Sequence, residues 1–192
     1  MTAGIFVAIV GPSGAGKDTL IRDAQARLAG DPRFHFVRRY VTRPASEHED
    51  HLTLTEAEFS DALHGGRFAL AWRAHGLCYA VPRSARSAVE AGAVAVCNLS
   101  RAALADARKA FPRQATVLIT APPDVLADRL SARGRETLAE VQARIEREAS
   151  RQSLSPDYTV VNDGTPQQGG QRLVDFLAPL NRELCRPLQS AG

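Results

Sequence analysis

Lysine is scarce in this chain of 192 residues, and its arginines form no basic cluster. Only two of the 24 basic residues are lysines, Lys17 and Lys109, and the other 22 are arginines spread along the chain. A net charge of +3 without a basic cluster does not point to a nucleic-acid partner. We therefore expect a small anion, rather than a polymer, as the partner.

Cysteine pairs and long apolar segments are also lacking. The three cysteines, Cys78, Cys97 and Cys185, form no C-x-x-C pair, which argues against a disulfide framework or a zinc site and favours a reducing compartment. The longest clean apolar run, Ile5–Val10, has six residues, whereas a membrane-spanning helix needs about 20. These absences lead us to expect a soluble, cytoplasmic protein with no membrane partner.

Strand and helix patterns alternate along most of the chain. Short apolar runs with β-branched residues predict strands, and apolar residues at helical spacing predict helices between them. Strands are predicted at 5–10, 35–41, 93–97, 115–120 and 159–161, and helices at 17–28, 82–91, 101–111, 123–132, 137–150 and 172–180. This alternation predicts a three-layer α/β fold in one domain over residues 1–192, with helices flanking both faces of a parallel sheet.

The stretch 38–82 departs from that alternation. A capping-box pattern from Thr55 to Glu58 predicts a short helix that ends at Leu63. Two further runs, 68–72 and 77–81, predict a small antiparallel pair. We interpret 38–82 as an inserted substrate-binding lobe. The core is then expected at about 4–34, 83–128 and 157–182, with a helical lid at about 129–150.

One segment carries phosphate-binding chemistry. The run Gly11-Pro12-Ser13-Gly14-Ala15-Gly16-Lys17 fits G-x-x-x-x-G-K and lies between a predicted strand and a predicted helix. Glycines let successive backbone N–H groups turn toward a phosphate, the helix N-terminus adds partial positive charge, and Lys17 reaches the β- and γ-phosphates. The segment predicts a P-loop NTPase fold whose loop binds the phosphates of a triphosphate.

The position after the loop lysine departs from the usual motif. Asp18 replaces the Ser or Thr that binds magnesium, and Thr19 follows it. A carboxylate beside a triphosphate is repelled unless a cation lies between them. Asp18 therefore either binds Mg²⁺, directly or through water, or is an ordinary acid of the first helical turn while Thr19 contacts phosphate.

Four further segments occur in the order and spacing found in guanylate kinases. They are Tyr-Val-Thr-Arg-Pro at 40–44, His-Gly-Leu-Cys-Tyr at 75–79, Arg-Leu-Ser-Ala-Arg-Gly-Arg-Glu at 129–136 and Asp-Tyr-Thr-Val-Val-Asn-Asp at 157–163. With the loop, they make the chain from Ile5 to about Gly164 resemble the guanylate kinase superfamily of P-loop kinases. The resemblance implies phosphoryl transfer from ATP, with Mg²⁺.

Departures from that superfamily fall on its base-recognition residues. The glutamate that pairs with guanine is replaced by Leu70, the second phosphate-binding arginine by Ser46, and the aspartate that ends the central strand by Asn98. A site built to hydrogen-bond a base loses much of its discrimination without its polar partner. GMP is therefore not the expected acceptor.

A narrower resemblance accounts for these departures. Lys17-Asp18 together with 39–45, 68–72 and 98–101 resembles the ribose 1,5-bisphosphate phosphokinases of the phosphonate-degrading carbon–phosphorus lyase pathway. This implies ATP-dependent conversion of ribose 1,5-bisphosphate, a base-free acceptor, to 5-phosphoribosyl 1-diphosphate and ADP. An acceptor phosphate oxygen is already anionic, so alignment and charge neutralisation replace a general base.

The family resemblance also implies roles for individual residues. Catalysis is expected from Lys17, Arg133 and Arg135, the latter two on a lid. Contacts to ATP are expected from the loop through Thr19, Arg129 and Asn162, and contacts to the acceptor from Arg39, Arg43, Tyr79, His51, Asn98 and Arg144. Arginine suits the acceptor side because its planar fork matches a phosphate.

Several of these side chains have a simpler interpretation. Arg129 and Arg144 can be exposed helix charges that pair with nearby glutamates. Arg38 and Arg39 point to opposite sides of a strand, so only one of them faces the site directly. His48-x-x-His51 is compatible with a metal site, an ordinary polar loop or, for His51, a ribose-hydroxyl contact.

Two other functions remain open from the sequence. One is a nucleoside monophosphate kinase such as guanylate kinase, against which Leu70 and Ser46 argue. The other is a non-catalytic, guanylate-kinase-like interaction domain, which would generally lack the loop lysine or the lid arginines that this chain keeps. A sugar phosphate as substrate and a monomer or homodimer are expected.

Overall fold

The computed structural model describes residues 4–44, 50–74, 76–131 and 155–184. The strands are β1 (Ile5–Val10), β2 (Phe34–Phe36), β3 (Tyr40–Val41), β4 (Leu52–Thr53), β5 (Phe68–Ala74), β6 (Leu77–Pro82), β7 (Val94–Asn98), β8 (Gln114–Thr120) and β9 (Tyr158–Val161). The helices are α1 (Lys17–Arg27), α2 (Glu56–His64), α3 (Arg83–Glu90), α4 (Leu104–Ala110), α5 (Pro123–Ser131) and α7 (Pro166–Leu184). A 3₁₀ turn, Arg101–Ala103, precedes α4.

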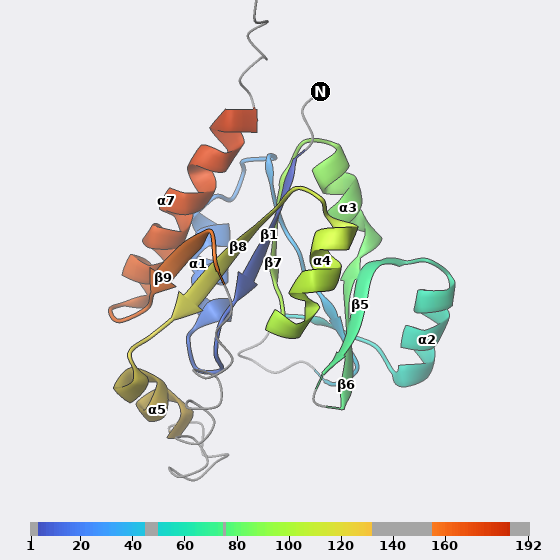
Figure 1. The fold of residues 1–192 in the computed structure, drawn as a ribbon, viewed down its shortest axis with the longest axis horizontal. Helices are drawn as coiled ribbons and strands as arrows, with labels where there is room; N and C mark the ends of the chain where they lie inside the picture. Colours follow the sequence, from blue (N-terminus) through green and yellow to red (C-terminus); the bar gives the residue numbers. More distant parts are fainter. Residues whose placement is uncertain (1–3, 45–49, 75, 132–154, 185–192) are drawn as a thin grey trace, which may run out of the picture.

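A parallel sheet forms the centre of the fold, in the strand order β2-β7-β1-β8-β9. Helices α1 and α7 cover one face, and α3 and α4 cover the other (Figure 1). The predicted three-layer α/β fold with a parallel sheet is confirmed. Because β1 lies in the middle, the loop that follows it opens at the centre of the sheet's carboxyl edge.

The two sides of β1 supply two separate cores. Val7 and Ile9 face the α1/α7 layer, whereas Phe6, Ala8 and Val10 face the α3/α4 layer. All five are fully buried, as expected for a strand covered on both faces. Phe6 stacks on Phe111, with ring centroids 4.0 Å apart.

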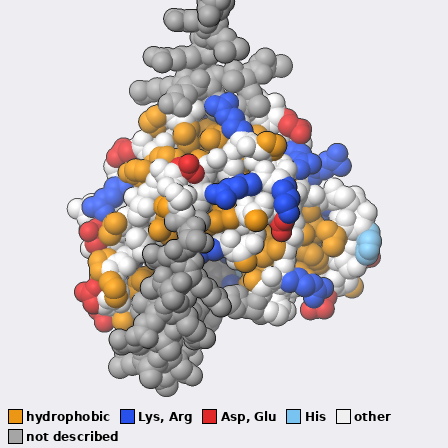
Figure 2. Space-filling view, viewed as in Figure 1, with side chains coloured by type: hydrophobic (Ala, Val, Ile, Leu, Met, Phe, Trp, Pro, Cys, Tyr) orange, Lys and Arg blue, Asp and Glu red, His pale blue; other side chains and the backbone are white. Residues whose placement is uncertain are grey.

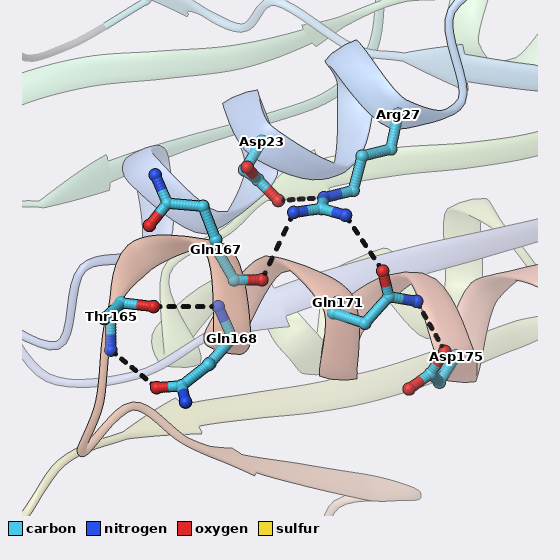
Figure 3. Close-up of polar contacts among 7 residues, drawn as sticks. All are labelled: Asp23, Arg27, Thr165, Gln167, Gln168, Gln171 and Asp175. Atoms are coloured by element: carbon cyan, nitrogen blue, oxygen red, sulfur yellow. Dashed lines mark hydrogen bonds and ion pairs between the residues drawn. The ribbon is translucent and has the colours of Figure 1, made fainter.

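Helices α1 and α7 approach each other closely because α7 contains two adjacent glycines. A Cβ on Gly169 would lie 2.7 Å from Leu20 Cδ2, and one on Gly170 would lie 2.8 Å from Asp23 Cβ. A polar chain runs along this interface (Figure 3): Arg27 Nε donates to Asp23 Oδ2 at 2.6 Å, and Arg27 Nη1 donates to the Gln171 side chain at 2.9 Å.

A second, smaller sheet is built from residues 40–82, in the order β4-β3-β6-β5. The predicted antiparallel pair is present as β5 and β6, which run on either side of Gly76. Helix α2 begins with the predicted capping box, because Thr55 Oγ1 accepts from Glu58 N at 3.2 Å and Glu58 Oε2 accepts from Thr55 N at 2.8 Å. This sheet and α2 lie to one side of the parallel sheet (Figure 1).

The prediction of one strand at 35–41 is wrong. The chain leaves the parallel sheet after Val37, whose N–H donates to Val96 O at 2.8 Å, and β3 then pairs with β6 and β4 in the second sheet. The reason lies in Arg38 and Arg39. Adjacent side chains of a strand point to opposite faces, so a strand covered by helices on both faces would bury both charges.

Other boundaries also differ from the predictions. Helix α7 begins at Pro166 rather than 172, because Thr165 and Gln168 form a reciprocal cap and proline fits the first helical position. The helix predicted at 101–111 starts as a 3₁₀ turn capped by Ser100. The short strand β4 was not predicted, and the predicted helix at 137–150 lies outside the described residues.

The α1/α7 contact yields a stability prediction. Gly170→Ala should lower the free energy of unfolding by about 1–3 kcal/mol, since Asp23 must move and loses its bond to Arg27. Alanine's better helix propensity, about 1 kcal/mol, offsets only part of that cost. Urea denaturation measures the difference.

The exposed neighbour Gln167 supplies the control, because Gln167→Ala changes the same helix without touching α1 through its side chain. We expect that variant to unfold within about 0.5 kcal/mol of the unmodified chain. A Gly170→Ala variant as stable as the unmodified chain would contradict the packing argument.

Candidate functional site

The carboxyl ends of the parallel strands gather the polar side chains of the site at one edge. The phosphate-binding loop follows β1, Asn98 ends β7, and Asn162 follows β9 directly. Asn98 and Asn162 are buried polar residues, with exposed fractions of 9% and 5%. Ligands of open α/β sheets bind at this edge, where neighbouring strands lead their loops to opposite sides.

The loop at 11–17 has the backbone shape that its glycines permit. Gly14 and Gly16 lie in the left-handed region, with φ of 84° and 85°, and Gly16 directly precedes the first residue of α1. A side chain at either position would be strained. The N-terminus of α1 therefore points its free N–H groups at the mouth of the loop.

Lys17 folds back over this loop. Its Nζ donates to the carbonyl oxygens of Gly11 and Pro12, at 2.9 Å each. The ammonium group is thus held at the loop's mouth, half-buried, where a phosphate would take over its hydrogen bonds.

Asn162 and Arg129 lie beside the loop, and Asn162 is bonded to it. Asn162 Nδ2 donates to Ala15 O at 2.8 Å, and an added Cβ on Gly16 would collide with that same nitrogen. The Arg129 Nη1 lies 4.0 Å from the same Cβ position and is buried without a hydrogen-bond partner in the described part of the chain. Asn162 therefore holds the loop, while its predicted contact with adenine stays a prediction.

Asp18 and Asn98 are joined directly. Asn98 Nδ2 donates to Asp18 Oδ1 at 2.6 Å, which links the first turn of α1 to the end of β7. The sequence placed both residues in the site but gave no sign of the bond, since they are 80 positions apart. The bond leaves the second carboxylate oxygen of Asp18 available to a cation, and Thr19 next to it is exposed.

Arg39 lies at the end of an aromatic stack. Its guanidinium carbon is 5.6 Å from the centre of the Tyr79 ring, and that ring stacks on Trp72 at 5.3 Å with 11° between the planes. Arg39 Nη1 also reaches Asn98 O at 3.5 Å. Its neighbour Arg38 pairs instead with Asp50, at 2.6 Å. Trp72 is the residue that sequence reasoning missed here, because nothing in its spacing shows which ring it meets.

His51 holds the backbone of Arg43. The His51 Nε2–H donates to Arg43 O at 3.2 Å, and Thr53 Oγ1 donates to the same oxygen at 3.0 Å. His51 is only 3% exposed. Its contact with a ribose hydroxyl stays a prediction. His48 and Glu49 lie outside the described residues, so the metal interpretation of 48–51 stays a prediction.

The predicted lid residues cannot be placed. Arg133, Arg135 and Arg144 lie outside the described residues, and α5 is described as far as Ser131. Their roles, and the boundaries of lobe and lid, stay predictions.

The cysteines near the site are packing residues. Cys78 and Cys97 are both buried free thiols. Burial raises the pKa of Cys97 to about 12, although the nearby charge of Arg39 acts in the opposite direction. The thiol is therefore protonated at neutral pH and is not a nucleophile.

Basic side chains are dispersed over the face drawn in Figure 2, among apolar and uncharged groups. Among the helices that the structure describes, none has the length and apolar character that crossing a membrane requires.

Comparison with known proteins identifies the family. No family model matches the chain. It is 49% identical over 174 residues to the ribose 1,5-bisphosphate phosphokinase PhnN of Methylobacterium radiotolerans, covering 91% of this chain and 97% of that protein. It is 43% identical over 185 residues to the protein of the same name from Acidiphilium cryptum, covering 96% and 98%.

The fold is shared with a solved guanylate kinase. That structure, from Anaplasma phagocytophilum, superposes with a TM-score of 0.67 at 17% identity and covers 96% of this chain and 88% of its own. At this identity the likeness concerns the fold alone. Taken together with the relatives of 43–49% identity over nearly the whole length, it shows that the chain is a phosphotransferase of guanylate-kinase-like fold and belongs to the ribose 1,5-bisphosphate phosphokinase family.

Proposed function

We propose that this kinase transfers the γ-phosphoryl group of ATP to the 1-phosphate of ribose 1,5-bisphosphate, in the cytoplasm. The products are 5-phosphoribosyl 1-diphosphate and ADP. The observation that carries the proposal is the 49% identity, over 91% of the chain, to a relative named for this substrate. The phosphate-binding loop at the sheet's carboxyl edge supports it from the structure.

The proposed acceptor is already an anion, so the reaction does not need a general base. An oxygen of the 1-phosphate attacks the γ-phosphorus, a new P–O bond forms, and the bond to the bridging oxygen of ADP breaks, with its electron pair leaving on ADP. No proton has to be removed from the acceptor. The protein's task is to align the two phosphates and neutralise their charge.

The position of Leu70 supports a base-free acceptor. Leu70 is 7% exposed and packs in the core with Val81 and the α3/α4 layer. Superfamily members that bind GMP use a glutamate at this point to pair with guanine. A leucine side chain offers no hydrogen bond to a base, so a nucleotide gains little over a sugar phosphate here.

On the donor side, Lys17 and the loop amides would hold the ATP phosphates. Lys17 Nζ would exchange its bonds to Gly11 O and Pro12 O for bonds to the β- and γ-phosphates. The buried Nη1 of Arg129 lies beside Gly16 and has no hydrogen-bond partner among the described residues, which fits a polyphosphate close to the loop.

The residues present also fit a magnesium ion. Asp18 would hold it, with Asn98 fixing the orientation of the carboxylate through the 2.6 Å bond. Mg²⁺ typically takes one or two carboxylates and completes its shell with water and substrate phosphates, which agrees with a single acid here. When bound, the ion neutralises charge on the β- and γ-phosphates.

On the acceptor side, Arg39, Arg43 and Tyr79 would hold substrate phosphate, while Arg133, Arg135 and Arg144 would close over the transferred group. Tyr79 is fixed by its stack on Trp72, and the Arg43 backbone by His51 and Thr53. These supports fix the Tyr79 ring and the backbone of Arg43 before substrate arrives.

A coupled ADP-release assay tests the choice of acceptor. We expect kcat/KM for ribose 1,5-bisphosphate to exceed that for GMP by at least about 100-fold, because the site lacks a polar partner for guanine. Buffer without acceptor measures background ATP hydrolysis. Comparable turnover with GMP would contradict the proposal.

The two lysines of the chain provide a matched pair for the donor site. Lys17→Ala should lower kcat by at least about 100-fold, since it removes a point charge from the transferring phosphates. Lys109→Ala removes an exposed lysine of α4 paired with Asp106, and should leave kcat unchanged. If kcat of Lys17→Ala is as high as that of Lys109→Ala, Lys17 does not contact the transferring phosphates.

The role of Asp18 is tested by the charge-removing variant Asp18→Asn. We expect the Mg²⁺ concentration for half-maximal activity to rise by roughly 10-fold or more, as for other residues that set metal affinity. Mn²⁺ binding in the presence of ADP, followed by electron paramagnetic resonance, should weaken in parallel.

Asp106→Asn is the control, because Asp106 is also an acid in the first turn of a helix and lies away from the site. If both variants keep the original Mg²⁺ and Mn²⁺ dependence, Asp18 is only an acid of the helix N-terminus.

A further inference from the structure

A pocket beside α1 is not explained by the binding of ATP. It lies between α1 and the segment that joins β2 to β3, next to the end of β7. The charged and polar residues around it that bear on its chemistry are Asp18, Arg22, Arg38, Arg39, Asp50 and Asn98. Asp18 connects it to the phosphate-binding loop, so a ligand in the pocket is adjacent to the donor site.

The charges in this pocket are not balanced. Of its three arginines, Arg38 is neutralised by Asp50 at 2.6 Å. Arg22 and Arg39 pair with no carboxylate in the described part of the chain. Asp18 also lines the pocket, so the pocket's three arginines exceed its two carboxylates, Asp18 and Asp50, by one positive charge. Two guanidinium groups at one pocket, neither of them paired with a carboxylate among the described residues, favour an anion with several oxygens.

Arg39 and Arg43 lie in different parts of the site. Both belong to the segment 39–45, yet Arg39 lines the pocket beside α1 and Arg43 does not. Arg39 is turned toward Asn98 and Tyr79, whereas the backbone of Arg43 is tied to His51 and Thr53 in the second sheet. An acceptor with two phosphate groups requires two such places.

We infer that the pocket beside α1 binds the second phosphate of the sugar bisphosphate, the one that is not phosphorylated, and that Arg22 and Arg39 are its cations. This inference rests on the proposed function. Phe36 and Val37 give the pocket an apolar wall that suits the carbon skeleton of the sugar next to the phosphate. Arg22 thus selects bisphosphates over monophosphates.

Binding of ribose 5-phosphate, which carries only the second phosphate, tests the pocket without any turnover. Isothermal titration should show Arg22→Gln binding it about 10- to 100-fold more weakly than the unmodified chain, the usual effect of losing a charged hydrogen bond to phosphate. Arg108→Gln, an exposed arginine on α4 on the opposite side of the sheet, removes the same charge and should bind normally. Thermal melting verifies that both variants are folded.

A kinetic comparison adds a second measurement. The preference for ribose 1,5-bisphosphate over ribose 1-phosphate, as a ratio of kcat/KM values, should fall by about 10-fold or more in Arg22→Gln and stay constant in Arg108→Gln. An unchanged ratio, equal binding of ribose 5-phosphate by the two variants, or no binding by the unmodified chain at millimolar ligand would each overturn the inference.

The two proposals fail in different ways. If the unmodified chain binds ribose 5-phosphate through Arg22 but releases no ADP with the bisphosphate, the pocket is a phosphate site and the proposed reaction is wrong. If the unmodified chain phosphorylates the bisphosphate and Arg22→Gln keeps the full preference for the bisphosphate over ribose 1-phosphate, the proposed reaction is supported and the role of Arg22 is wrong.

Discussion

Repulsion between phosphate groups is the constraint that the proposed reaction places on this structure. In that reaction a triphosphate and an anionic acceptor come within a few ångströms of each other, and their like charges repel strongly once water is excluded from the site. The carboxyl edge of the parallel sheet gathers the compensating groups: the amides of the loop and of the α1 N-terminus, Lys17, and Arg39 on its aromatic stack. Each is held in position before any ligand arrives, which lowers the cost of alignment.

Much of the surrounding packing serves to keep that edge rigid. Asn162 ties the end of β9 to Ala15, and Asn98 ties the end of β7 to Asp18, so the loop and the first turn of α1 are anchored to strands on both sides of β1. Gly169 and Gly170 let α7 press α1 against the sheet. A change at this helix contact would thus reach the phosphate site through α1, without touching it directly.

The sequence predicted the features that depend on local chemistry. The strand–loop–helix unit around Lys17, the capping box at Thr55 and the β5/β6 pair could all be predicted, because spacing and residue type determine them. Contacts between distant segments could not: the Asn98–Asp18 bond and the stacking of Trp72 on Tyr79 depend on how the sheets come together. The end of the strand after Val37 was partly predictable, because two adjacent arginines argue against a strand that is buried on both faces. The Thr165–Gln168 cap was a local signal that could have been used.

In the proposed reaction the attacking atom is a phosphate oxygen, for which no general base is needed. Phosphorus-31 magnetic resonance of the products formed from ATP and ribose 1,5-bisphosphate tests this most directly. The account predicts a new pair of mutually coupled diphosphate signals, one of them coupled to the anomeric hydrogen, with the 5-phosphate signal unaltered. A new phosphomonoester signal on a ribose hydroxyl, with the 1-phosphate left as a monoester, would contradict it.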